Sequence, residues 1–247
     1  MYKTTNGLVL RETNYKEADK ILTVLSESEG KITVSARGTR RKGSRIAAAS
    51  QLLVYSEMTL FNYKGRWSLN EANTNELFNG LRNDIVLLSL GSYFAELLEA
   101  VTDEDQPNPQ ILSLGLNSLY ALGTGIKSKE IIKAAFEIRL MCLAGFEPSI
   151  DACSGCGKDD FDDLRIDLQG GVIYCASCGK NQSGTMPLCA DSLNALRFIT
   201  GAESKKLFSF KIGGDALKRL SSVAEAYVLA HMERSFGTLD FYKSLNY

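Results

Sequence analysis

Four cysteines in two matched pairs are the residues of this chain best suited to chemistry. They follow the pattern Cys-x2-Cys, eighteen residues, Cys-x2-Cys, and each pair is followed by Gly-Lys. This spacing is typical of a zinc site, because each pair supplies two thiolates from one tight turn. Four thiolates fill a tetrahedral shell, so we expect one structural zinc ion and no open position for catalysis. The expected ligands are Cys153, Cys156, Cys175 and Cys178.

The segment between the two pairs predicts a hairpin. Gly170-Gly171 separates two short strand-like pieces, 164–168 and 172–174, as in a zinc ribbon. A redox role would require a reactive Cys-x-x-Cys at a helix N-terminus, which two matched pairs fit poorly. Cys142 lies among apolar residues and is expected in the core, and His231, the single histidine, is expected to be a packing or surface residue.

A basic segment near the N-terminus is the second candidate site. Residues 31–45 carry six cations and no acid, whereas the chain has a net charge of −1, so all other residues sum to −7. Interleaved glycines and serines suit a loop that contacts phosphates, although a solvated charged loop is the alternative. Phe61, Tyr63 and Trp67 could stack on bases, but aromatic residues of a barrel are more often core. The expected DNA-binding residues are Arg37, Arg40, Arg41, Lys42 and Arg45.

Acidic residues offer a third chemistry, that of a magnesium-dependent nuclease. The densest acids are Asp159, Asp160, Asp162 and Asp163, which fall inside the expected ribbon. A solvated acidic turn is the simpler interpretation there. We therefore expect no catalytic residue.

The composition bounds the class of protein. With 45% hydrophobic and 23% charged residues, the chain can form an ordinary globular core. It has no stretch of ~18 uncharged apolar residues and no visible signal peptide. We therefore expect a cytoplasmic protein without a membrane partner, whose six cysteines stay reduced.

Two regions must position these sites. The pattern of the first 75 residues predicts short strands that fit a small barrel, most economically an OB-like Greek key. An SH3-like barrel suits the strand count nearly as well. The expected strands are 6–11, 21–25, 31–37, 52–61 and 66–72. Helical periodicity follows. The expected helices are 85–101, 110–122, 128–144, and two begun by the N-caps Asp191 and Asp215 that reach Gly201 and Gly237.

The expected fold class is therefore α+β, with an N-terminal OB-like β-barrel and a C-terminal helical domain containing an inserted four-cysteine zinc ribbon. The expected domains are residues 1–79, an OB-fold DNA-binding domain, and residues 80–247, a helical domain with the zinc module at 151–182.

In their order along the chain these residues resemble the RecO family of bacterial recombination mediators. The resemblance covers most of the chain and includes the family's basic stretch at residues 37–45. The matching blocks are Gly7-Leu-Val-Leu; Tyr15, Glu17 and Asp19; Glu29-Gly30-Lys31; Ala36-Arg37-Gly38-Thr39-Arg40-Arg41; residues 136–148; and the cysteine pairs with Gly170-Gly171.

The resemblance implies a nucleoid-associated DNA repair protein that is not an enzyme. It implies binding to single- and double-stranded DNA, annealing of complementary strands, and work with RecR and the single-stranded-DNA-binding protein to load RecA. The acidic tail of that coat protein would need an apolar groove with cations, for which Lys133, Arg139 and Arg197 are candidates, or else solvated charges. The alternative is a zinc-ribbon, OB-fold RNA-binding protein of the translation or transcription machinery.

Overall fold

A computed structural model describes residues 1–161 and 163–245 of the chain. These residues form two compact units. Unit 1 comprises residues 1–124 and the C-terminal segment from Phe236, and unit 2 comprises residues 125–235. The expected boundary after residue 79 separates the barrel from helices that belong to the same unit. No helix in the described part of the chain is both long and apolar enough to span a membrane.

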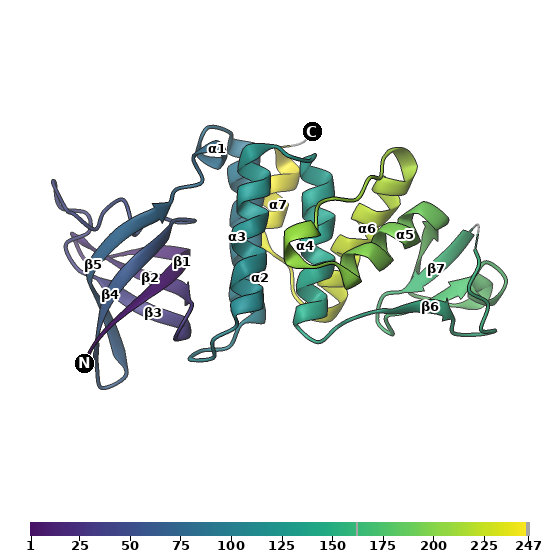
Figure 1. Cartoon of the computed structure of the whole chain (residues 1–247), viewed down its shortest axis with the longest axis horizontal. Helices are drawn as coiled ribbons and strands as arrows, with labels where there is room; N and C mark the ends of the chain where they lie inside the picture. Colours follow the sequence, from purple (N-terminus) through teal and green to yellow (C-terminus); the bar gives the residue numbers. More distant parts are fainter. Residues whose placement is uncertain (162, 246–247) are drawn as a thin grey trace. The chain divides into compact units, whose positions relative to one another are not determined.

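Unit 1 begins with a closed five-stranded barrel (Figure 1). Its strands are β1 (Tyr2–Tyr15), β2 (Asp19–Ser26), β3 (Gly30–Ala36), β4 (Tyr55–Tyr63) and β5 (Arg66–Glu76). The order around the barrel is β1-β2-β3-β5-β4, and β3 pairs with β5 in parallel, Val34 opposite Trp67. This arrangement confirms the OB-like prediction. The SH3-like alternative is wrong, because a meander would pair β3 with β4.

Alternation along the strands fills the barrel with apolar side chains. Residues that point inward, such as Val24, Val34 and Leu60, are completely buried in one core cluster. Trp67 is half-buried and packs against the same cluster. Its ring therefore contributes to the core, as expected of aromatic residues in a barrel.

The outer face of β1 and β2 is also buried, although it lies outside the barrel core. Leu8 pairs with Leu25 across the two strands, and neither is exposed to solvent. Leu8 is covered by α3 (Pro109–Thr124), where a methyl group added to Gly115 would lie 3.8 Å from Leu8 Cδ2. Next to it, Arg11 pairs with Glu99 of α2 (Ile85–Val101) at 2.9 Å. The barrel thus packs its β1–β2 face on these helices.

Two short helices complete unit 1, and both differ from expectation. The four-residue helix α1 (Asn79–Arg82) was not expected. The helix predicted from Asp215 is present, but its predicted end at Gly237 is wrong, because the chain turns left-handed at Glu233 and restarts as α7 (Gly237–Ser244). α7 packs on α2, where Phe236 contacts Tyr93 edge-on at a centroid distance of 5.8 Å.

Unit 2 consists, in its described residues, of a four-stranded sheet and three α-helices. Its sheet, in the order β6-β8-β7-β9, is formed by β6 (Ser149–Cys153), β7 (Asp163–Asp167), β8 (Val172–Cys175) and β9 (Thr185–Cys189). Its α-helices are α4 (Lys129–Leu143), α5 (Ala190–Gly201) and α6 (Gly214–Met232), of which α5 and α6 pack on the sheet through β9. Asp191 and Asp215 are not N-caps but lie in the first turns of α5 and α6, where carboxylates favour the helix dipole.

A buried ion-pair cluster joins α4 to α6. Lys133 on α4 lies 2.7 Å from Glu137, one turn later on the same helix, and 2.9 Å from Glu225 on α6. The side chains of Lys133 and Glu137 are almost fully buried, so water cannot replace the attraction between them. Burial favours the neutral amine, but the two carboxylates outweigh it and raise the pKa of Lys133. The cation is therefore part of the unit 2 core.

Replacing Lys133 by alanine is expected to destabilise unit 2 by about 3–5 kcal/mol, because the carboxylates of the cluster stay buried without their shared cation. Lys218→Ala is the matched control, since it removes a lysine of α6 whose ion pair with Asp215 is exposed. The control should change stability by no more than about 0.5 kcal/mol. Urea unfolding of both variants measures the difference. Equal stability of the two variants would contradict the role given to Lys133.

Candidate metal centre and nucleic-acid interface

Two tight turns in the sheet of unit 2 bring the four predicted cysteine ligands together. Cys153 ends β6 and Cys156 lies in the turn after it, while Cys175 ends β8 and Cys178 begins a short 3-10 helix. The predicted hairpin is confirmed, because β7 and β8 pair antiparallel. The strands β6 and β9, which complete the sheet, were missed by the sequence interpretation.

The four sulfur atoms fit a tetrahedral metal ion. All four lie within 4.8 Å of one another, and Cys156 Sγ is 3.8 Å from Cys175 Sγ. Around an ion with metal–sulfur bonds of about 2.3 Å, tetrahedrally placed sulfurs lie about 3.8 Å apart. Among the residues that the structure describes, this is the one group of cysteine, histidine or acidic side chains that could hold a metal ion.

Backbone N–H groups stabilise thiolate in this cluster. Burial raises the pKa of the Cys153 thiol, but N–H groups of Cys175, Gly155 and Cys156 donate to its sulfur and lower the pKa to about 6. The bond from Cys175 N–H measures 3.2 Å. Hydrogen bonds to the other three sulfurs, that to Cys175 first, raise the pKa of Cys178 to about 12. Cys153 is therefore already close to the deprotonated form that a metal requires.

The close approach of the two turns depends on small residues. A methyl group added to Gly155 would lie 3.0 Å from both Cβ and Sγ of Cys178, so a larger residue would push the pairs apart. At the hairpin turn, Gly171 has φ of +62°, and its missing Cβ would lie 2.8 Å from the Tyr227 hydroxyl. Glycine is thus required at this turn for both backbone conformation and space.

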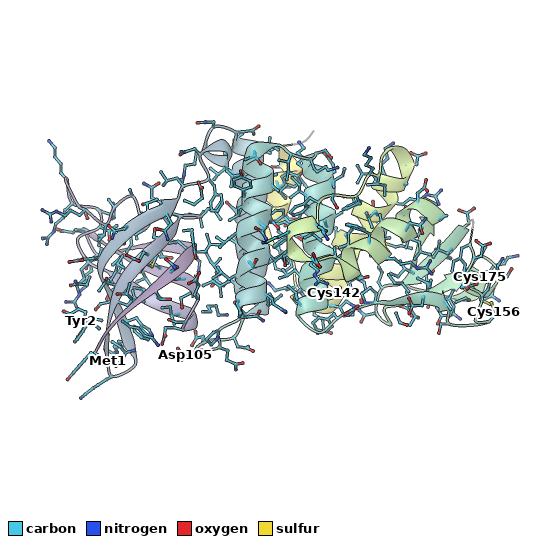
Figure 2. The ribbon with its side chains drawn as sticks, viewed as in Figure 1. Met1, Tyr2, Asp105, Cys142, Cys156 and Cys175 are labelled. Carbon is cyan, nitrogen blue, oxygen red and sulfur yellow. The ribbon has the colours of Figure 1, made fainter. Side chains whose placement is uncertain are left out.

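The cysteines outside the pattern lie elsewhere. Figure 2 shows Cys142 apart from Cys156 and Cys175. Cys142 is half-buried on α4, and burial raises its pKa to about 11. Cys189 ends β9, with its sulfur 3.2 Å from Ser192 Oγ. His231 packs between the rings of Tyr227 and Phe146, as expected of a packing residue.

The basic segment forms a loop between β3 and β4 on the barrel. Gly38 N–H donates to the side-chain Oδ1 of Asp19 (2.8 Å) and Arg40 N–H donates to the carbonyl of Ala18 (2.9 Å), which holds the loop against the β1–β2 turn. All five predicted cations of the loop have exposed side chains, and among the described residues none of them pairs with an acid. These five are Arg37, Arg40, Arg41, Lys42 and Arg45. The loop therefore presents unneutralised positive charge to solvent.

The three cations that the sequence offered for tail binding each make polar contacts within unit 2. Lys133 is in the buried ion-pair cluster. Arg139 Nη1 donates to the carbonyl of Thr200, and Arg197 donates to the carbonyls of Ile150 and Asp151 at 3.0 and 2.6 Å. All three thus join elements of the unit; Lys133 is buried and is not a solvated charge, whereas Arg139 and Arg197 are half-buried.

Of the acidic residues of the nuclease alternative, Asp159 and Asp160 lie in the connection that leads to β7, and Asp163 is the first residue of that strand. Asp159 and Asp160 are exposed, and Asp163 lies 3.3 Å from Arg219. Asp162 lies outside the described residues.

Fold and site together define a protein with an OB-type barrel, a basic loop on that barrel and a four-cysteine module set among helices. Family models give this class a name. The model "Recombination protein O N terminal" matches residues 1–78, and "Recombination protein O C terminal" matches residues 82–240. The chain belongs to the RecO family.

Individual relatives agree with this assignment over nearly their whole length. The DNA repair protein RecO of Acetivibrio thermocellus is 34% identical over 245 residues, which cover 99% of this chain and 98% of that protein. That of Symbiobacterium thermophilum is 30% identical, covering 97% and 96%. That of Alkaliphilus metalliredigens is 28% identical, covering 98% of each. Family membership supports a role in DNA repair and recombination.

Cys153→Ser is expected to abolish metal binding and to lower the melting temperature by about 10 °C, because ligands that converge only in the folded chain couple metal binding to folding. Cys142→Ser is the control, since its sulfur lies outside the cluster. Elemental analysis and thermal unfolding measure both effects. Protein purified without chelator that contains no bound metal would contradict the assignment of this site.

Proposed function

We propose that the chain binds single- and double-stranded DNA through the basic loop of its barrel. The observation that carries this proposal is the set of five exposed cations without an acidic partner among the described residues. In a chain with a net charge of −1, such a local excess of positive charge attracts a polyanion. The residues in contact are Arg37, Arg40, Arg41, Lys42 and Arg45.

The loop is suited to phosphates rather than to base edges. Reading bases requires side chains held on a rigid helix or strand, whereas residues 37–54 form a succession of turns. Phosphate contacts are independent of sequence and occur in both single and double strands. A protein that acts on any damaged or recombining DNA needs this tolerance.

The metal at the four cysteines is, in this proposal, one structural zinc ion. Four thiolates in a tetrahedral arrangement are typical of zinc and leave no position for water or substrate. Zinc would lock the β6 turn to the β8 turn. The sheet of unit 2 has strands of only four or five residues, so it gains more from such a lock than a larger sheet would.

The wider role that we propose is that of a recombination mediator without catalytic activity, acting at the nucleoid. It anneals complementary strands and, with RecR and the single-stranded-DNA-binding protein, helps to load RecA onto coated single strands. Family membership supports this role. The competing nuclease would degrade DNA when magnesium is added, and the competing RNA-binding protein would prefer RNA to DNA of equal length.

A groove in unit 2 supports contact with the acidic tail of the coat protein. A cavity of about 390 Å³ lies between α5 and residues 210–213. Phe198 and Phe210, with ring centroids 5.6 Å apart, provide an apolar wall, and the exposed Lys211 provides a cation. Apolar anchors beside a positive charge suit a short peptide that ends in an aromatic residue and a carboxylate.

Replacing Arg40 and Arg41 by alanine is expected to weaken binding to all DNA sequences alike. Each lost phosphate contact should flatten the log–log salt dependence for single strands by about 0.7, so the double variant should lose about 1.4. A variant with Lys205→Ala and Lys206→Ala, two adjacent exposed lysines of unit 2, is the control. Fluorescence anisotropy over a salt series gives the slopes. An unchanged slope in the Arg40 and Arg41 variant would place the DNA site elsewhere.

Annealing of coated strands is expected to depend on the tail of the coat protein. Deleting the tail should slow annealing of coated strands, and Phe198→Ala combined with Lys211→Glu should slow it equally with the intact coat. Annealing of bare strands by this variant should stay unchanged. The measurement is the rate of duplex formation with fluorescent strands. If deleting the tail changes neither binding nor annealing, the proposed role as an adaptor is wrong.

A further inference from the structure

We propose that Tyr2, Phe61 and Tyr63 form a stacking platform for the unpaired bases of single-stranded nucleic acid. This inference rests on the DNA-binding function proposed above and adds to it a separate contact, made with bases instead of phosphates. The platform is named here the aromatic platform and consists of these three side chains. It lies on β1 and β4, whereas the basic loop follows β3.

Strand register brings the three rings together on one face of the barrel. Residues two apart on a strand point to the same side, so Phe61 and Tyr63 of β4 both point outward while Leu60 points into the core. Tyr2 lies directly opposite Phe61 on β1, with ring centroids 5.0 Å apart. The terminal amine of Met1 donates to Asn62 O at 3.0 Å, which holds this end of β1 in place. Figure 2 labels Met1 and Tyr2 at this end of the barrel.

The rings of the platform are not required for the core. Tyr2 is 62% exposed and Tyr63 is 61% exposed, whereas the inward-pointing neighbours Met58 and Leu60 are completely buried. Trp67, the one tryptophan of the chain, points to the other side and packs on the core. Exposed rings gathered in this way offer flat apolar surfaces to solvent, which is the feature that nucleic-acid bases use for stacking.

Positive charge lies next to the platform, at the tip of the β4–β5 hairpin. Arg66 is paired with Tyr63 across the two strands, and Lys64 Nζ lies 5.5 Å from the centroid of the Tyr63 ring. Both cations are exposed, and neither forms a salt bridge among the described residues. A strand whose bases stack on the rings can therefore place its phosphates beside Lys64 and Arg66. The acids Glu57 and Glu71 lie further from the hairpin tip. Their negative charge repels phosphates, so the surface suited to a nucleic-acid strand ends before them.

The packing of unit 1 favours this face over the one that OB folds often use. Many OB folds bind oligonucleotides on strands 2 and 3. Here the outer residues Thr23 and Leu25 of β2 are buried, and Lys31 of β3 donates to the Glu99 carbonyl of α2 at 2.8 Å. At the hairpin and the start of β1, which carry the platform, Tyr2 and Tyr63 are exposed and Phe61 is half-buried. Bases thus have access to rings on this face.

Stacking predicts a preference that phosphate contacts do not. Bases in a duplex are already stacked and paired, so the platform can hold bases of a single strand only. Stacking on an aromatic ring also releases no counterions, so losing it should leave the salt dependence of binding unchanged. Loss of the loop cations has the opposite signature, a flatter salt dependence with both kinds of DNA.

The test compares Tyr2→Ala, Tyr63→Ala and their double variant with the native chain, using an oligo-dT single strand and a duplex of equal length. Affinity for the single strand should fall about tenfold for each ring lost, with no change for the duplex and none in the salt slope. Tyr2→Phe and Tyr63→Phe should bind like the native chain, because the ring remains. Tyr120→Ala, which removes a tyrosine of α3 that is 56% exposed, should also bind normally.

Two results would contradict the stacking proposal while leaving the proposed DNA-binding function intact. The double variant could bind oligo-dT as tightly as the native chain, or it could lose affinity for single strand and duplex equally, which would indicate contact with phosphates. In either case the Arg40 and Arg41 variant would still show its flatter salt dependence. If the native chain binds neither DNA, the proposed function fails together with the platform.

Discussion

Leu8 and Leu25 point outward from the barrel, and burying them is the constraint on which the rest of unit 1 depends. A closed barrel satisfies its own backbone, but these two side chains would leave an apolar patch in water. Packing by α2 and α3 removes the patch and decides which strands stay open to solvent. The ion pair of Arg11 with Glu99 then orients the same face. The basic loop and the β4–β5 hairpin are exposed because the helices cover the opposite side.

Unit 2 is held together in a different way. Its strands are short, so the sheet alone buries little apolar surface. Two further sets of contacts stabilise the unit. The four cysteines bring the β6 and β8 turns together, while Lys133, Arg139 and Arg197 join helices and strands through polar contacts, of which that of Lys133 is buried. The sequence does not show that these cations are structural, because partners such as Glu225, which lies 92 residues from Lys133, are far away along the chain. A helical unit of this kind is suited to hold a partner groove in fixed shape.

The two contacts that we propose differ in their physical basis. A loop of arginine and lysine attracts any phosphate backbone, and its affinity depends on salt. Rigid rings on paired strands bind only what can lie flat on them. A protein with both contacts can hold duplex and single strand while favouring the latter, a combination that suits strand annealing.

Much of this could be predicted from the sequence, because it depends on local pattern. Alternating apolar residues in the first 75 positions predict the strands, and the spacing of Cys153, Cys156, Cys175 and Cys178 predicts their convergence, since each turn needs only its own few residues. The choice of an OB over an SH3-like barrel depended on the pairing of β3 with β5. The paired residues Val34 and Trp67 are 33 positions apart in the sequence and meet only when the barrel closes. The end of α6 at Met232 and the burial of Lys133 likewise needed the tertiary structure, because backbone torsion and distant partners decided them. Residue types determined the chemistry available to this chain; long-range packing decided which side chains are free to use it.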